Sequence, residues 1–294
     1  MKLRIELLVV LVLCTQISLA QEVIPLWKDG EMPNSKGMEL KDSIVNERYL
    51  QSGKPVLRAF FSSKQENTGA AVLIIPGGGY HHVTYQISGD QIAKWFNTMG
   101  VNAFVLIYRL PLSPDLEQRE LGPIQDAEQA MRMIRDRSVE WSIDQDRIGV
   151  WGCSAGGHLS AVLSNSQNLD ARPDFSILVS PVIDLGIYAH EGSRDNLLGV
   201  GASTKKIEAY SVQNMVSSET PPTILFHADD DRSVSPMNSI LYYEALKSNK
   251  TAASLHIFKS GGHNIALRNN PGATQLWTEI CEEWLMESGY LKED

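Results

Sequence analysis

A single serine stands between glycines where an apolar run of the chain ends. The stretch RIGVWGCSAGGHL, residues 147–159, places Gly152, Ser154 and Gly156 in the spacing GxSxG. This spacing is typical of a turn between a strand and a helix that exposes a nucleophilic serine hydroxyl at the edge of a sheet. Glycines after a strand also form sharp turns that have no catalytic role. The motif alone leaves both interpretations open, so a base, an acid and an oxyanion site must be sought elsewhere.

A serine hydroxyl is a poor nucleophile unless an imidazole takes its proton and a carboxylate orients that imidazole. Among the seven histidines, His263 lies in KSGGHNIAL, a glycine-rich loop after the last strand-like run. Its position gives the chain order serine, acid, histidine that accompanies this turn. We therefore predict that His263 is the base. The histidines whose place in the chain fits less well are His81, His82, His158, His227 and His256.

The acid should follow the preceding strand-like run. There the stretch TILFHADDDRSVSP, residues 223–236, offers three consecutive aspartates. We favour Asp231, because the loop after it can turn into a helix that begins near Pro236. Asp229 and Asp230 remain alternatives at this point, since one or two of the three are ordinary solvated loop acids.

An oxyanion site needs backbone N–H groups close to the developing charge. In LIIPGGGYHH, residues 73–82, three glycines directly follow an apolar run, so bare backbone can approach a substrate. We predict that the N–H groups of Gly78, Gly79 and Ala155 form this site. Tyr80 and His82 are expected to contact the substrate. A phosphate loop is the alternative interpretation, but no lysine follows at the spacing that a P-loop requires.

Apolar runs and helical periodicity alternate along the chain. The periodicity predicts helices over 123–136, with Ile124 and Ile134 on its apolar stripe, and over 274–288, with Leu276 on its stripe. This alternation indicates a single α/β domain, residues 21–294, with a doubly wound, mostly parallel sheet. In such sheets ligands bind beyond the carboxyl ends of the strands. The predicted strands are 56–61, 70–75, 102–108, 147–151, 175–180, 223–227 and 254–258.

Composition excludes several kinds of partner. The formal net charge is −9. Nucleic acids and anionic membrane surfaces bind basic proteins, so neither is expected here. No group of residues has the spacing of a common metal or cofactor site, and we expect none.

Residues 1–20 have the features of a secretory signal: two basic residues, an apolar run and small residues before a cut after Ala20. The apolar run is too short to span a bilayer. A lipid anchor on Cys14 is not expected, because the preceding Leu13 is bulky. We therefore predict export. After removal of residues 1–20, two cysteines remain, Cys153 and Cys281. We expect both to be buried thiols rather than partners in a disulfide.

The segment 181–222 is expected to form a small cap over the site. It mixes charged and polar residues with few aromatics, whereas a long-chain lipase needs a broad apolar surface. We therefore predict a shallow cleft with a polar rim, which accepts a bulky hydroxylated alcohol and a short acyl group.

Five motifs carry a family resemblance: PGGGY, YRL, GCSAGGHL, HADDDRSV and GGHNIAL. They resemble those of α/β-hydrolase esterases, most of all the secreted bacterial carbohydrate esterases that remove acetyl or feruloyl groups from xylan. The resemblance implies a triad of Ser154, Asp231 and His263. It also implies that Arg109 pairs with Asp126 as a structural brace.

The sequence departs from the family pattern at Cys153 and Asn264, beside the serine and the histidine. The resemblance implies an acylated oligosaccharide or polysaccharide as substrate. The alternatives are a general carboxylesterase, a serine peptidase of the same fold, for whose usual propeller domain there is no room, and a non-catalytic carbohydrate-binding protein. An intact triad and a glycine-rich oxyanion loop argue against the last of these.

Overall fold

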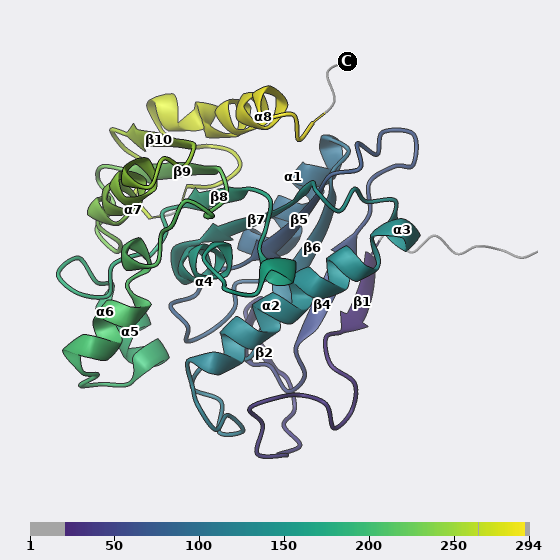
Figure 1. Ribbon diagram of the computed structural model, residues 1–294, viewed down its shortest axis with the longest axis vertical. Coiled ribbons are helices and arrows are strands. Elements are labelled where there is room, and N and C mark those ends of the chain that lie inside the picture. The colour runs from purple at the N-terminus through teal and green to yellow at the C-terminus, as the bar shows by residue number, and fades with distance from the viewer. Residues whose placement is uncertain (1–20, 264, 292–294) are drawn as a thin grey trace, which may run out of the picture.

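The computed structural model describes residues 21–263 and 265–291. The predicted signal segment 1–20, with Cys14, and Asn264 lie outside the described residues. An eight-stranded sheet forms the centre (Figure 1). Its strands in spatial order are β1 (Gln21–Pro25), β4 (Val56–Phe60), β6 (Asn102–Ile107), β5 (Ala71–Ile75), β7 (Ile148–Cys153), β8 (Ser176–Val179), β9 (Thr223–Ala228) and β10 (Ala253–Phe258).

The sheet is mostly parallel. Only its first two pairings, β1 with β4 and β4 with β6, are antiparallel among the described strands. The central strands β5 and β6 are buried along their whole length, as their unbroken apolar runs predict for strands covered on both faces. The predicted parallel α/β sheet is confirmed, and each of its predicted strands is present within two residues of its expected ends. A separate hairpin joins β2 (Ser43–Val45) to β3 (Arg48–Gln51).

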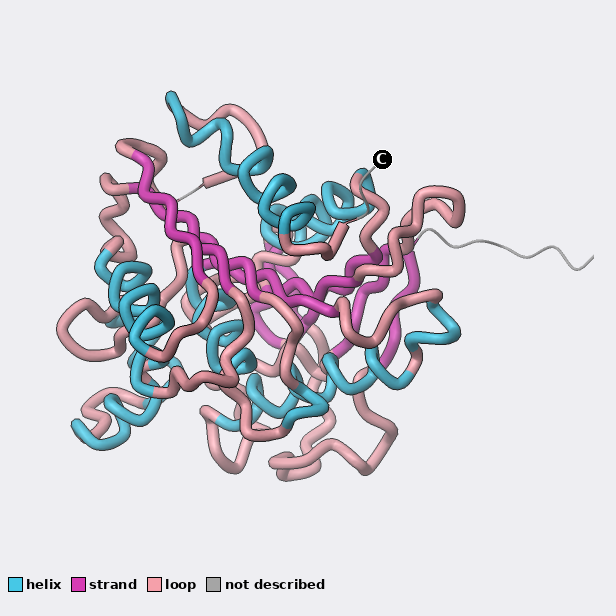
Figure 2. Tube along the Cα trace, turned by 45° about the horizontal axis from the view of Figure 1, so that its top comes forward, coloured by secondary structure: helices cyan, strands magenta, loops and turns pink. Residues whose placement is uncertain are grey.

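Helices cover both faces of the sheet, as Figure 2 shows. On one face α1 (Gln91–Thr98) meets α8 (Trp277–Glu287) through their tryptophans, Trp95 and Trp277, whose ring centroids lie 5.3 Å apart. On the other face α4 (Ser154–Ser164) packs on β7 and β8 and against α2 (Leu121–Asp136). The remaining helices are α3 (Ser138–Trp141), α5 (Glu191–Leu198), α6 (Thr204–Tyr210) and α7 (Met237–Ser248).

The last helix differs from its prediction at the N-terminal end. A 3₁₀ turn occupies Gly272–Leu276, and the α-helix begins at Trp277. Leu276 is therefore exposed, while Trp277, Cys281 and Leu285 form the buried line of the helix. Their four-residue spacing is a helical stripe one residue out of phase with the expected one. Among the described residues, no helix is long and apolar enough to cross a membrane.

A buried ion pair ties the loop after β6 to α2. The guanidinium of Arg109 donates to both carboxylate oxygens of Asp126, at 2.8 Å in the shortest contact, and its backbone N–H donates to the same carboxylate. Trp27 donates its indole N–H to Asp126 as well. Because so many donors meet one carboxylate, the cost of burying its charge is offset. The brace that the resemblance implied is confirmed.

Candidate active site

Ser154 stands at the turn between β7 and α4, in the strained conformation that the GxSxG motif requires. Its φ is +55°, a left-handed value that costs energy for any residue with a side chain. A side chain at Gly156 would overlap the carbonyl oxygen of Ile75 in β5, so only glycine lets the helix start this close to the sheet. The strand, turn and helix around the motif are therefore those that the motif predicts, and Ser154 is half-buried at the turn.

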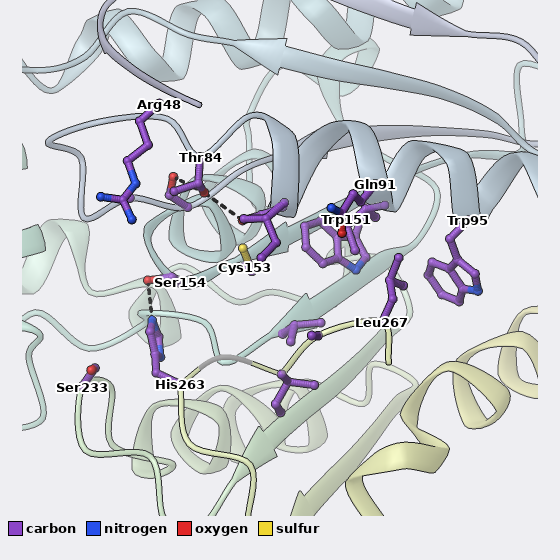
Figure 3. A pocket seen from close by; sticks show the side chains of 18 of the residues that line it. Arg48, Thr84, Gln91, Trp95, Trp151, Cys153, Ser154, Ser233, His263 and Leu267 are labelled. Atoms are coloured by element: carbon purple, nitrogen blue, oxygen red, sulfur yellow. Dashed lines mark hydrogen bonds between the residues drawn. The ribbon is translucent and has the colours of Figure 1, made fainter. Parts of the chain in front are cut away.

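Three residues from distant parts of the chain meet at this turn, and Figure 3 shows two of them, Ser154 and His263. His263 Nε2 lies 2.9 Å from Ser154 Oγ, and His263 Nδ1 lies 2.7 Å from Asp231 Oδ2. When Nδ1 carries the proton and donates it to the carboxylate, Nε2 is free to accept the proton of the serine hydroxyl. The structure thus brings together the three residues that the sequence and the resemblance indicated.

Asp231 is held as an ionised carboxylate. Its Oδ1 accepts the backbone N–H groups of Ser233 at 2.9 Å and Val234 at 3.0 Å. Burial acts to raise the pKa of Asp231, but contacts with His227 and His263 and the Val234 N–H outweigh it and hold the pKa well below its usual range. The carboxylate therefore keeps its charge and its orientation toward His263 at neutral pH.

The neighbouring aspartate has a different role. Asp230 Oδ1 accepts the backbone N–H groups of Gly261 at 2.9 Å and Gly262 at 2.7 Å, directly before His263. It thereby fixes the loop that carries the imidazole. Asp229 is exposed. The sequence alone could not assign these different roles to three adjacent aspartates, since each of them could have faced the histidine.

The glycine loop after β5 packs directly on the serine turn. A Cβ placed on Gly77 would lie 3.0 Å from the Cβ of Ser154. Gly78 has a φ of +133°, and a side chain there would overlap the carbonyl oxygen of His82. Among the described residues, the N–H groups of Gly78 and Gly79 donate to no backbone acceptor, and Ala155 lies in the first turn of α4, where N–H groups have no partner within the helix. Such N–H groups beside a serine can donate hydrogen bonds to a carbonyl oxygen on which negative charge develops.

Tyr80 does not reach the cleft, so its expected contact with substrate is wrong. Its side chain is buried, and its hydroxyl lies 2.8 Å from His158 Nδ1. His158 Nε2 lies 2.9 Å from the carbonyl oxygen of Tyr210 at the end of α6. Burial lowers the pKa of His158 to about 4, so the imidazole is neutral and links the glycine loop to the segment 181–222. His82 does line the cleft, and its contact with substrate stays a prediction.

The cleft over Ser154 has a volume of about 1280 Å³, above the roughly 300–1,000 Å³ of common small-molecule sites. The segment 181–222 contributes three lining residues, His190, Gly192 and Asn196. Most of the wall of the cleft therefore comes from other parts of the described chain, and the shallow cleft with a polar rim stays a prediction. Apolar side chains that line the cleft include Ile87, Trp95, Trp151, Ile265 and Leu267. Figure 3 shows Trp151, Leu267 and Trp95 on the side of the cleft away from Ser154, and these form its apolar wall.

Both cysteines of the described chain are free thiols. Cys281 is fully buried, as expected. Cys153 differs from expectation, because it is only partly buried and lines the cleft beside Ser154. Burial of its thiol raises the pKa of Cys153, which keeps it protonated at neutral pH.

Comparison with known proteins agrees with this geometry. Residues 57–246 match the model of the BD-FAE family. Over 201 residues, 67% of this chain and 41% of the relative, the sequence is 40% identical to an acetylxylan esterase of Xylanibacter ruminicola. Over 210 residues, 68% of this chain and 33% of the relative, it is 30% identical to an endo-1,4-beta-xylanase B of Butyrivibrio fibrisolvens. The match thus spans less than half the length of these two relatives.

Among solved structures, one similar chain is an acetyl ester-xyloside bifunctional hydrolase from Caldicellulosiruptor lactoaceticus. The two superpose with a TM-score of 0.77 at 34% identity, covering 92% of this chain and 97% of the other. The family match covers well over half of the sequence. The chain therefore belongs to the BD-FAE family and has the α/β-hydrolase fold.

Proposed function

We propose that the protein is a serine esterase that removes acetyl groups from xylan or its fragments through an acyl-enzyme. The observation that carries this proposal is the hydrogen-bonded chain of Ser154, His263 and Asp231, which opens into a cleft beside bare backbone N–H groups. Relatives named as an acetylxylan esterase, a xylanase and an acetyl ester-xyloside hydrolase support the choice of substrate.

The reaction follows from the geometry. Ser154 Oγ attacks the ester carbonyl carbon while its proton passes to His263 Nε2, and the charged imidazolium is stabilised by Asp231. The carbonyl oxygen becomes an oxyanion that accepts hydrogen bonds from the N–H groups of Gly78 or Gly79 and of Ala155. When the C–O bond breaks, His263 gives its proton to the leaving alcohol oxygen. Water, deprotonated by the same imidazole, then attacks the acyl-serine and releases the acid and free serine.

A second candidate acyl group is an aromatic one, such as feruloyl. The apolar wall favours it, because Trp95 and Trp151 line a part of the cleft that an acetyl group would leave empty. A flat ring packs well against tryptophan side chains. Both candidates use the same triad and the same alcohol, so they differ only in the acyl half.

Four measurements test these proposals. Labelling with a fluorophosphonate should modify Ser154, as read by mass spectrometry, and no label on Ser154 would contradict a serine esterase.

The purified protein should hydrolyse acetylated xylo-oligosaccharides, and feruloylated ones are then compared at equal concentration. If p-nitrophenyl decanoate is cleaved as well as the acetate, the short-acyl proposal fails. A Trp95→Ala variant that loses activity on feruloyl esters alone would assign the apolar wall to aromatic acyl groups.

We also propose that the protein is exported, on the basis of the signal-like composition of residues 1–20. Expression of the full chain in a bacterial host should release a mature form that begins at Gln21. N-terminal sequencing of the periplasmic and extracellular fractions measures this. Recovery of an uncut chain in the cytoplasm alone would contradict export.

A further inference from the structure

His190 lies over the glycine loop without a part in the reaction described above. It precedes α5 and lines the cleft. A Cβ placed on Gly79 would lie 3.8 Å from His190 Cε1. From the same helix, Asn196 Nδ2 donates to the carbonyl oxygen of Gly79 at 2.8 Å. The imidazole is thus fixed next to the loop that supplies the oxyanion N–H groups.

Hydrogen bonds decide which nitrogen of His190 carries the proton. Nδ1 accepts the backbone N–H of Ser193 at 3.1 Å and lies 2.8 Å from the Ser193 hydroxyl, which is buried. A ring nitrogen that accepts an N–H group has no proton of its own, so in the neutral ring the proton is on Nε2. Burial, and then the nearby His263, lower the pKa of His190 against the opposing effect of Asp231. The ring is therefore neutral at neutral pH, with Nε2–H as its donor.

This donor has no acceptor within the described part of the chain. An ester bound at Ser154 offers two kinds of acceptor: the carbonyl oxygen and the oxygens of the alcohol half. The carbonyl oxygen already has the N–H groups of the glycine loop and of Ala155. An acetyl group, the acyl half proposed first, offers no further acceptor. The alcohol half must lie near His263, which protonates its oxygen, and His190 lines the same cleft as His263.

We propose that His190 Nε2–H donates to a hydroxyl of the sugar that carries the ester, and so selects polyhydroxylated alcohols over simple ones. This inference rests on the proposed esterase function. A site built to bind a hydroxyl discriminates strongly against alcohols that lack one, because its buried polar group is then left unpaired.

The test compares kcat/KM for two substrates in one variant. His190→Ala should lower kcat/KM for an acetylated xylo-oligosaccharide by about tenfold or more, because a hydrogen bond to the sugar is lost. For p-nitrophenyl acetate, whose alcohol has no neighbouring hydroxyl, the change should stay below about threefold. His190→Gln, which keeps an N–H donor, should recover part of the loss on the sugar ester. Glu191→Gln, an exposed position in the same helix, is the matched control and should leave the ratio unchanged.

Each other result overturns the inference. An equal loss on both substrates would make His190 a further oxyanion donor or a structural residue, and an unchanged melting temperature distinguishes the former. No loss on either would show that Nε2 meets no substrate atom. Wild-type protein that cleaves p-nitrophenyl acetate but no acetylated sugar would overturn the proposed substrate as well, whereas an active wild type with an unchanged ratio would overturn this inference alone.

Discussion

The loops after β9 and β5 both bring groups to Ser154, but they are held in opposite ways. The loop after β9 is fixed by its carboxylates: Asp231 binds the imidazole and two N–H groups, and Asp230 binds the loop of His263. The loop after β5 is fixed by the absence of side chains, because Gly77 and Gly78 touch the serine turn and the backbone of His82. The first loop should therefore tolerate changes in side-chain shape but not the loss of a charge. The second loop should tolerate neither a larger side chain nor a different backbone conformation.

The charge of Asp231 gives the largest expected effect within this comparison. Asp231→Asn keeps the shape of the side chain but favours the wrong tautomer of His263, so kcat should fall by about 10⁴-fold. Steady-state hydrolysis of p-nitrophenyl acetate measures it. Asp229→Asn, at the exposed neighbour, serves as control and should retain activity. If the control variant were the inactive one, the assignment of the acid would be wrong.

The size of Gly78 comes next. A methyl group there would overlap the carbonyl oxygen of His82 at a φ of +133°, so the loop must move away from the oxyanion. We expect Gly78→Ala to lower kcat by about 10²–10³-fold. Gly201→Ala has the same kind of backbone strain but meets no atom within 4 Å, and it should lower stability without lowering kcat. Full activity of the Gly78→Ala variant would show that this loop takes no part in the reaction.

Asp230 should have a smaller effect, because it acts on His263 only through the backbone. Asp230→Ala leaves the N–H groups of Gly261 and Gly262 without their acceptor and lets the imidazole drift, which should lower kcat by about ten- to hundredfold. Asp230→Asn keeps one oxygen acceptor and should lose less. Should both variants match wild type in kcat and melting temperature, the loop would be fixed by other contacts.

The smallest effect is on stability at low pH. Because contacts in the folded protein depress the pKa of Asp231, its carboxylate adds stability above the unfolded pKa of about 3.9, and this is lost as the pH falls through the lower folded pKa. Asp231→Asn should be less stable than wild type by about 1–3 kcal/mol at pH 7. Denaturant unfolding at pH 7 and pH 3 should show that gap narrowing in acid. A gap that widens in acid would contradict the depressed pKa.

The sequence was sufficient for residues that local rules place. Ser154 follows from a glycine motif after a strand, and His263 from a glycine loop in the right chain order. Both inferences use glycine motifs a few residues long, and the second adds only the order of the residues along the chain. The division between Asp230 and Asp231 lay beyond them, because it depends on how two loops meet.

Other features required the assembled sheet. Trp95, Trp151 and Leu267 form one wall of the cleft although they are far apart in the chain, so no local pattern indicated that wall. Tyr80 was misplaced because its own φ of +57° is part of a turn in which its ring packs inward on His158 rather than toward the substrate. The first strand, β1, was not predicted, since it directly follows the signal-like segment and pairs only at the antiparallel edge of the sheet.

The central claim is that Ser154 and His263 act as one catalytic unit, and a double-mutant cycle tests it most directly. Ser154→Ala, His263→Ala and the double variant should each lower kcat for p-nitrophenyl acetate by about 10⁴-fold or more, with the double variant no worse than either single one. Circular dichroism and melting temperature confirm that each variant is folded. Losses that multiply in the double variant, or activity near wild type in either single variant, would contradict the account.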